Sequence, residues 1–137
     1  MDIIKFFKSL TLEDWSKKVT DKWTVKDVLS HLVGWDREVV IELKNTFGKE
    51  KEPWFMATDD YTEFNDKIYD EFKNSSPEEL LIEFEKWEKA WEQEIKNIGE
   101  NKIRQKEHMG WVFDEDVGDE PHFEHHVNQV KKVLNKF

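Results

Sequence analysis

Two long segments carry large apolar residues at three- and four-residue spacing, and this feature constrains the fold most. Residues 24–47 form the first segment. Thr24 and Asp27 resemble a capping box, in which a side-chain oxygen at the cap and an acid three residues later satisfy backbone N–H groups. Gly48 follows the segment, as glycine often does at a helix end. One face of this predicted helix carries Val25, Val28, Leu29, Leu32, Val39, Val40 and Leu43.

Residues 76–98 form the second long segment. Ser76 is a standard cap, Pro77 occupies the first helical position, and Gly99 closes the pattern. The regular spacing of its tryptophans indicates a core stripe rather than a surface that stacks against a cofactor. The stripe consists of Leu80, Phe84, Trp87, Trp91, Ile95 and Ile98.

Shorter segments complete a helical pattern. Residues 2–9 and 11–18 predict two short helical pieces, residues 60–73 predict a third main helix, and the stretch from about 119 to the chain end predicts a fourth. Residues 100–118 lack helical periodicity, and a connection of that length tends to be functional or to contain short elements. Strand-like alternation is nearly absent. The sequence therefore predicts an all-α fold, an antiparallel four-helix bundle with a short extra N-terminal helix.

The core must be built from few, large side chains. Only 37% of the 137 residues are hydrophobic, but they include seven Trp and ten Phe, and each of these buries a large area. A chain of this length buries about two-thirds of the surface that its unfolded form exposes. We therefore expect residues 1–137 to form a single domain.

The charge balance excludes several partners. The chain has 31 acidic and 21 basic residues, a formal charge of −10, and no Lys/Arg-rich run or face. Nucleic acid and anionic membrane surfaces both require a clustered basic footprint, so neither is an expected partner. No apolar stretch approaches the ~20 residues of a membrane span, and the N-terminus does not resemble a signal peptide. Because cysteine is absent, which fits a reducing compartment, we expect a cytoplasmic protein.

Three histidines carry the main functional signal. His122 and His126 lie one turn apart along a flank of the last predicted helix's apolar stripe, whereas His125 points to the opposite, polar face. Two imidazoles at this i, i+4 spacing can reach one metal ion. A zinc protease of the HExxH kind needs Glu directly after the first His, and Phe123 occupies that position, so this class is excluded. The stripe consists of Phe123, Val127, Val130, Leu134 and Phe137.

His31 is the third histidine of this set. It lies on a flank of the predicted helix 24–47, where its ring could reach a cavity at one end of the bundle. Three histidines from two facing helices leave coordination positions open, as in catalytic rather than closed structural metal sites. The alternative is that His31 is a hydrogen-bonded boundary residue and that His122 and His126 form a solvated pair. On spacing alone the sequence favours this alternative.

Two strings resemble a known family. Residues 23–36, WTVKDVLSHLVGWD, look like the second-helix signature of the DinB-like superfamily of four-helix bundle proteins. Residues 121–129, PHFEHHVNQ, resemble its closing HxxxHxxQ helix, and residues 61–65, followed by a helix break and a long helix, also fit. The superfamily includes the maleylpyruvate isomerase-like thiol-dependent enzymes and the ClbS/DfsB branch.

The resemblance implies an antiparallel bundle with a divalent metal at one end. The family's metal ligands match His31, His122 and His126, and zinc or nickel would suit imidazole ligands. Related enzymes are thiol transferases, isomerases or hydrolases that act on small electrophiles. This chain departs from the family pattern in its short first helix and in having no basic cluster that would hold an anionic thiol cofactor.

Asp36 and three tryptophans are further candidates. Asp36 falls inside the apolar stripe of its helix, where a carboxylate is costly unless it is paired. It either lines a cavity as a base or substrate contact, or forms a salt bridge with a neighbouring helix, and the salt bridge is slightly favoured. Trp35, Trp54 and Trp111 are candidates for lining a substrate pocket, although isolated aromatic residues more often pack in a core.

Two other patterns carry less weight. The acidic run 114–120 places its glycine at the fifth position instead of the sixth and lacks the distal Glu of a calcium loop. A solvated loop explains this run better. His108 lies in the aperiodic segment, and we do not expect it to be a fourth metal ligand.

The leading hypothesis is a metal-dependent enzyme that acts on a small electrophilic molecule, as a hydrolase or as a thiol transferase or isomerase, with a role in metabolism or detoxification. A divalent ion with an open position would make water more acidic or polarise a substrate oxygen. One alternative is a non-catalytic bundle that sequesters a hydrophobic small molecule. Another is a structural or interaction bundle whose His cluster is empty. Whether the chain forms a homodimer is left open.

Overall fold

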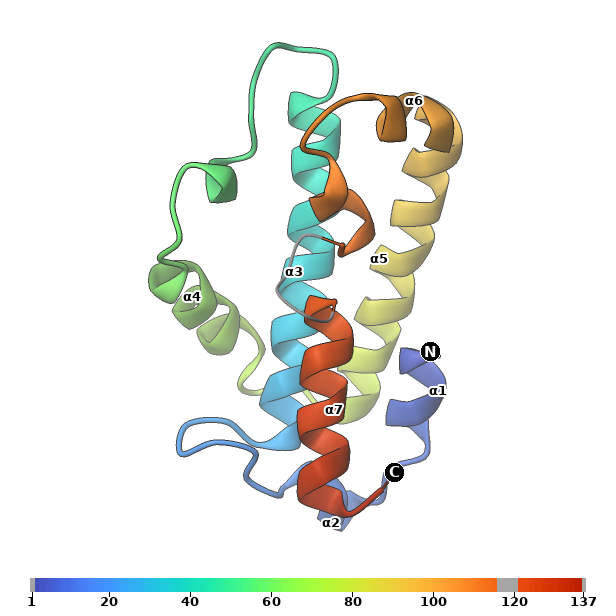
Figure 1. Cartoon of the computed structure of the whole chain (residues 1–137). Helices are drawn as coiled ribbons and strands as arrows, with labels where there is room; N and C mark the ends of the chain where they lie inside the picture. Colours follow the sequence, from blue (N-terminus) through green and yellow to red (C-terminus); the bar gives the residue numbers. More distant parts are fainter. Residues whose placement is uncertain (1, 116–120, 137) are drawn as a thin grey trace.

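Two long helices, α3 (Val25–Thr46) and α5 (Pro77–Ile98), lie side by side in the computed structural model and form its most extensive packing interface (Figure 1). The structure describes residues 2–115 and 121–136. The predicted segments 24–47 and 76–98 agree with these two helices to within a residue at each end.

Local capping chemistry begins both long helices. The hydroxyl of Thr24 accepts a hydrogen bond from the backbone N–H of Asp27. The Asp27 carboxylate in turn accepts a hydrogen bond from the backbone N–H of Thr24 at 2.9 Å. Ser76 and Glu79 make the same reciprocal pair, with distances of 3.0 and 3.1 Å. Each pair satisfies two backbone donors that a helix start leaves without intrahelical partners. The capping residue predicted at each start is therefore confirmed.

Two further helices pack on the α3–α5 pair. α4 (Thr62–Phe72) lies along one side of α3, and α7 (His122–Leu134) packs on its front in the view of Figure 1. Along the chain the four helices alternate in direction, as the colours of Figure 1 show. This confirms the predicted antiparallel bundle.

The extra N-terminal helix consists of two short pieces. α1 (Ile3–Lys8) packs against α5, and α2 (Leu12–Trp15) packs against α3. Phe7 and Trp15 are both buried, and their rings stack with centroids 5.7 Å apart. The aromatic contact joins the two pieces into one cap over the lower end of the core.

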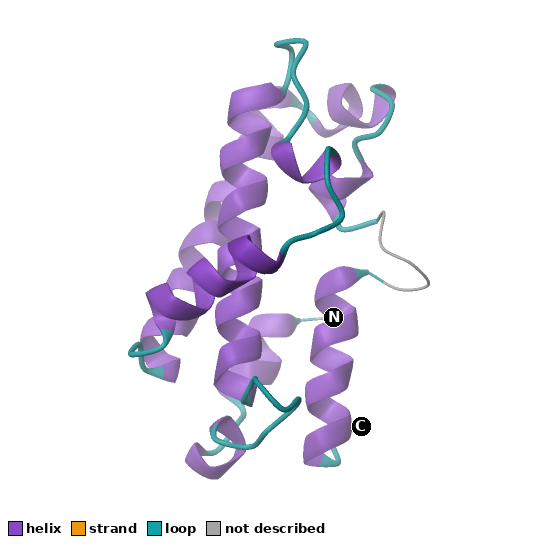
Figure 2. Ribbon diagram, turned by 90° about the vertical axis from the view of Figure 1, so that its left-hand side faces the viewer, coloured by secondary structure: helices purple, strands orange, loops and turns teal. Residues whose placement is uncertain are grey.

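The segment 100–118, which lacks a helical pattern, contains two short elements. α6 (Glu100–Gln105) and the 3₁₀ helix η2 (Gly110–Phe113) cover the upper part of the α3–α5 pair, whereas α7 covers the lower part (Figures 1 and 2). Buried residues of the two elements form a second core cluster with α3 and α5, made of Leu43, Ile95, Ile103 and Val112. The fourth wall of the bundle therefore has two parts. The predicted start of the last helix at 119 and 120 lies outside the described residues.

The first half of α3 is enclosed on every side. Residues 28–36 form an unbroken buried run, and this run includes Ser30, His31 and Asp36. A single apolar face was the prediction for this helix, and that prediction was too narrow. The reason is that α4, α5 and α7 all pack against α3, so side chains beyond the apolar stripe are covered as well.

The described residues contain no strand. Lys18 and Thr24 form an isolated β-bridge in the loop before α3. Among the described helices, none has both the length and the apolar character needed to cross a bilayer. The all-α prediction is therefore confirmed.

Gly34→Ala is expected to destabilise the fold. A Cβ at Gly34 would overlap three side-chain carbons of Ile68 on α4, and Ile68 is itself buried. Overpacking costs about 1–3 kcal/mol, against about 1 kcal/mol that alanine gains over glycine inside a helix. Urea denaturation of the wild type and the variant measures the net loss in free energy of unfolding.

A double variant provides the control. Ile68→Ala removes the atoms with which the new Cβ would collide, so Gly34→Ala should cost less in the Ile68→Ala background than in the wild type. Equal costs in the two backgrounds would contradict the proposed close approach of α3 and α4.

Candidate metal centre

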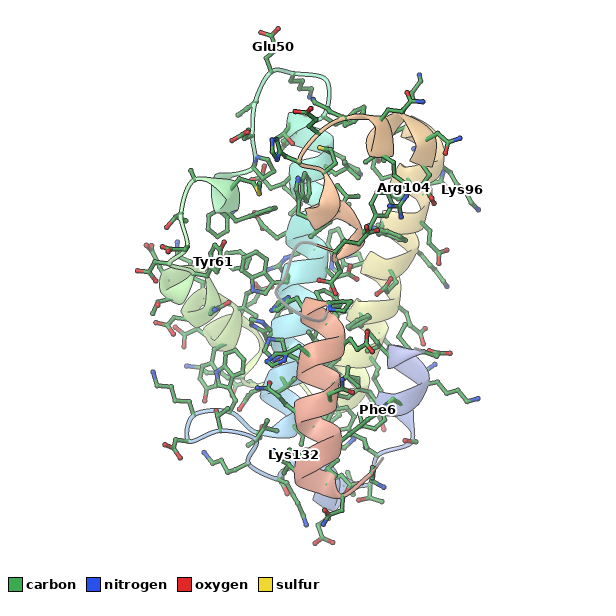
Figure 3. The ribbon with its side chains drawn as sticks, viewed as in Figure 1. Phe6, Glu50, Tyr61, Lys96, Arg104 and Lys132 are labelled. Carbon is green, nitrogen blue, oxygen red and sulfur yellow. The ribbon has the colours of Figure 1, made fainter. Side chains whose placement is uncertain are left out.

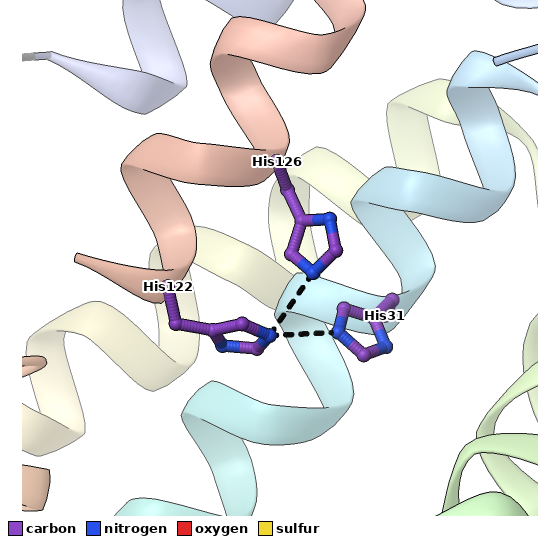
Figure 4. Close-up of side chains that lie close together, drawn as sticks. All are labelled: His31, His122 and His126. Atoms are coloured by element: carbon purple, nitrogen blue, oxygen red, sulfur yellow. Dashed lines mark hydrogen bonds between the residues drawn. The ribbon is translucent and has the colours of Figure 1, made fainter. Parts of the chain in front are cut away.

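Three histidine side chains converge between α3 and α7. His31 lies in the enclosed half of α3, and His122 and His126 lie one turn apart at the start of α7 (Figure 4). The Nε2 atom of His122 is 3.1 Å from Nε2 of His31 and 3.0 Å from Nε2 of His126. One ligand atom from each ring lies within 4.8 Å of the other two. The structure thus brings together the three residues that the sequence singled out.

A glutamine fixes the tautomer of one ring. Nδ1 of His126 lies 2.9 Å from Oε1 of Gln129. An amide oxygen only accepts hydrogen bonds, so Nδ1 carries the proton and Nε2 of the neutral ring keeps its lone pair. A hydrogen bond of this kind also orients the ring of a metal-binding histidine. His126 is therefore held with its ligand nitrogen directed at His122.

Burial keeps the three rings neutral. Loss of hydration, with a smaller contribution from the neighbouring rings, lowers the pKa of His31 to about 2 and that of His122 to about 4. Burial also lowers the pKa of His126, against the opposing effect of the Gln129 hydrogen bond. At neutral pH the rings therefore carry lone pairs, which is the form that binds metal.

The donor set fits a divalent cation. Nε2 of His122 contacts both other Nε2 atoms, and a single proton on it could make a well-aligned hydrogen bond to only one of them. A cation between the rings would accept all three lone pairs. Three neutral imidazoles suit zinc or nickel. His31 lacks one feature of many metal ligands, because its Nδ1 has no hydrogen-bond partner among the described residues.

Asp114 sets the position of His122. Pro121, the residue before α7, makes no side-chain hydrogen bond that caps the helix. Instead, the Asp114 carboxylate accepts hydrogen bonds from the backbone N–H groups of His122, at 3.0 Å, and Phe123, at 2.9 Å. This joins the end of η2 to the start of α7. The solvated-loop prediction is therefore wrong for Asp114, which is partly buried; residues 116–120 of that acidic run lie outside the described residues.

A cavity of about 580 Å³ lies beside the three rings. His31, His122 and His126 line it, together with Asp36 and a largely aromatic wall. The aromatic and apolar part of the wall includes Trp23, Trp35, Phe55, Tyr61, Trp91 and Trp111. A volume of this size fits a small organic molecule.

The three candidate tryptophans occupy two layers. Trp35 and Trp111 line the cavity, whereas Trp54 packs behind Trp35, with ring centroids 6.0 Å apart. Trp54 belongs to the 3₁₀ helix η1 (Trp54–Met56), and its Nε1–H donates to Glu38 at 2.8 Å. Tyr61, just before α4, lies on the side of α4 that faces α3 (Figure 3), and its ring meets that of Trp35 edge-on.

Asp36 presents a buried carboxyl group to the cavity. It is 6% exposed, and its Oδ2 has no hydrogen-bond partner among the described residues. Burial, together with the nearby Glu88 and Asp114, raises the pKa of Asp36 to about 8. Burial and Glu92 raise the pKa of Glu88 to about 7. The sequence slightly favoured a salt bridge for Asp36. The described residues show none, because the charged neighbours of Asp36, Glu88 and Asp114, are acidic.

The two remaining histidines lie elsewhere. His125 is exposed on α7, as its predicted position on the polar face requires. His108 lines a different cavity, with Phe47 and Met109, and is not part of the three-histidine group. The cluster therefore has three histidines among the described residues.

A sequence profile of the DinB superfamily matches residues 1–118. The chain belongs to the DinB superfamily, as its two signature strings predicted. The matched range contains His31 and Asp36 and ends before α7, which carries His122 and His126. No curated protein and no solved structure is significantly similar to the chain. Its place in a particular branch of the superfamily stays a prediction.

Asp36→Asn is expected to stabilise the metal-free protein, by an amount that grows with pH. The pKa of Asp36 is about 8 in the fold and near 3.8 in the unfolded chain. Between these values the folded wild type holds one proton more than the unfolded chain, so its stability falls by about 1.4 kcal/mol per pH unit. Asparagine has no such proton. Urea denaturation of chelator-treated protein at several pH values measures the difference.

Asp70→Asn is the matched control, because Asp70 is exposed on α4. Its stability should follow that of the wild type at every pH. A gap between Asp36→Asn and the wild type that stays constant or shrinks as the pH rises would show that Asp36 is not buried in its protonated form.

Proposed function

We propose that this protein is an enzyme that uses a divalent metal ion, zinc or nickel, to act on a small electrophilic molecule by hydrolysis or by thiol transfer or isomerisation. The observation that carries the proposal is the convergence of three neutral imidazoles at the wall of a cavity. His31, His122 and His126 would hold the ion. Three protein ligands leave coordination positions for solvent or substrate.

A divalent ion at this place would supply Lewis acidity, which makes water a better nucleophile and polarises a substrate oxygen. The protein's own residues supply the rest. Gln129 and Asp114 hold two of the ligand histidines in position. The aromatic wall excludes water from the apolar part of a bound molecule.

Asp36 and Glu88 are suited to proton transfer. Both carboxyl groups line the same cavity as the histidines, and burial raises the pKa of each to a value near neutrality. A general acid or base is most effective when its pKa lies close to the working pH. In the proposed reaction the pair takes the proton of the nucleophile and returns it to the leaving group. This assigns a catalytic role to Asp36, with Glu88 as its partner.

The composition of the wall favours water over an anionic thiol as the nucleophile. None of the described residues that line the cavity is Lys or Arg. An anionic thiol cofactor would meet the carboxyl groups of Asp36, Glu88 and Asp114 without a basic side chain to pair with. Hydrolysis or ring opening by water is therefore the form of the proposal that the wall supports best.

Sequestration without catalysis is the second candidate function. The same cavity has a predominantly aromatic lining, which would bind an apolar molecule whether or not a metal is present. A bundle of this kind would bind its ligand stoichiometrically and release it unchanged. Turnover distinguishes the two functions.

Metal content tests the proposal directly. The wild type, reconstituted with zinc or nickel and desalted, should retain about one ion per chain, whereas His31→Ala and His122→Ala should lose it, because two imidazoles bind far more weakly than three. His125→Ala is the matched control, since it removes an exposed histidine from the same helix. Mass spectrometry of the metals provides the measurement.

Retention of metal by His122→Ala at the wild-type level, or absence of metal from the reconstituted wild type, would refute the three-histidine site. With the metal established, a panel of small epoxides, lactones and esters tests catalysis. Asp36→Asn should lower kcat by about 10²–10⁴-fold while the protein keeps its metal.

A further inference from the structure

Among the described residues that line the cavity, the titratable side chains other than tyrosine are acids and histidines, with no basic lysine or arginine. They include the carboxyl groups of Asp36, Glu88 and Asp114 and no lysine or arginine, although the chain has 21 basic residues. The two arginines are engaged elsewhere. Arg37 makes a bidentate pair with Glu71 at 2.7 and 2.8 Å, and Arg104 pairs with two glutamates at the upper end of the molecule.

One of these carboxyl groups has an unmet hydrogen-bonding requirement. Asp36 is 94% buried and faces the cavity, and its Oδ2 has no partner among the described residues. A buried oxygen without a hydrogen-bond partner destabilises the fold. A ligand that brings a donor or a positive charge into the cavity would remove this cost. Glu88, which raises the pKa of Asp36 and lines the same cavity, would strengthen the attraction.

Three aromatic residues of the wall present their rings to the cavity while their polar atoms bond within the protein. Nε1–H of Trp35 donates to Asn65 at 2.9 Å, and Nε1–H of Trp91 donates to the carbonyl of Val112 at 2.8 Å. The hydroxyl of Tyr61 donates to a backbone carbonyl at 3.0 Å. These polar atoms are therefore used within the protein, and the rings remain available for apolar and cation–π contact.

We propose that the cavity binds an organic cation, namely a small apolar or aromatic body that carries a protonated or quaternary amine. The amine lies against Asp36 and Glu88, and the apolar body lies against the aromatic wall around Trp35 and Trp111. This names the substrate class of the proposed enzyme and in that respect rests on the proposed function. Neutral molecules of the same size bind more weakly because they bring no positive charge to the two carboxyl groups, and anionic molecules bind more weakly because the carboxylates repel them.

Three probes of equal size and different charge test the inference. They are 2-phenylethylammonium, 2-phenylethanol and phenylacetate, each titrated into chelator-treated protein and followed by calorimetry and tryptophan fluorescence. The cation should bind about ten-fold or more tightly than the alcohol, with phenylacetate the weakest. Asp36→Asn should reduce the affinity for the cation by about ten-fold and leave that for the alcohol within about two-fold.

Glu88→Gln provides a second variant, on a different helix, and should lower the affinity for the cation in the same direction. Asp70→Asn, an exposed substitution of the same kind on α4, should bind all three probes as the wild type does. Equal binding of the cation and the alcohol, an unchanged preference in both cavity variants, or no binding of any probe would overturn the inference.

The zinc content of the same samples separates this inference from the proposed function. A wild type that retains zinc after reconstitution and shows no preference for the cation refutes only the substrate class. A preference for the cation in a chain that binds no zinc refutes the metal enzyme and supports a cation-binding bundle. His122→Ala should lose zinc and keep the preference, because the carboxyl pair lies on α3 and α5.

Discussion

The enclosure of α3 is the constraint on which the candidate site depends. Polar side chains in the buried run 28–36 have little access to solvent, because α4, α5 and α7 pack against α3. The Ser30 hydroxyl donates a hydrogen bond to the carbonyl of Lys26 in the same helix, and Nε2 of His31 contacts Nε2 of His122. One carboxyl oxygen of Asp36 has no hydrogen-bond partner in the part of the chain that the structure describes. A buried polar group without a partner costs free energy, so the fold sustains Asp36 at a cost to its stability. Function is the simplest reason to retain it.

Local chemistry made the long helices predictable. The capping residues Thr24 and Ser76 act on groups three positions away, and apolar spacing marks the faces that pack. α6 and η2 have no such pattern. Each contributes one main buried residue, Ile103 or Val112, to a cluster whose other members belong to α3 and α5. Contacts between distant segments define these elements, and a single sequence does not record such contacts.

The candidate site was predictable where its signal was periodic. Spacing along one helix paired His122 with His126, and a carboxylate inside an apolar stripe marked Asp36. Glu88 has the same signal, four residues after Phe84 and three before Trp91, but the many other glutamates of this segment make it hard to single out from the sequence. Asp114 has no periodic signal. Its role depends on backbone N–H groups eight and nine residues later, which only the folded chain brings into reach.

Burial sets the protonation state on both sides of the cavity. It lowers the pKa of the three histidines and raises the pKa of Asp36 and Glu88, so the metal-free cavity carries little formal charge near neutral pH. A positive charge brought into this space interacts with imidazole lone pairs and favours ionised carboxylates at the same time. The metal ion and the organic cation would therefore bind for the same reason. The cavity wall contains buried imidazole and carboxyl groups, and none of its described residues is a lysine or arginine. Because both would be attracted to the carboxylates, a bound ion weakens the attraction for the amine, and the two binding events are coupled through the protonation of Asp36 and Glu88.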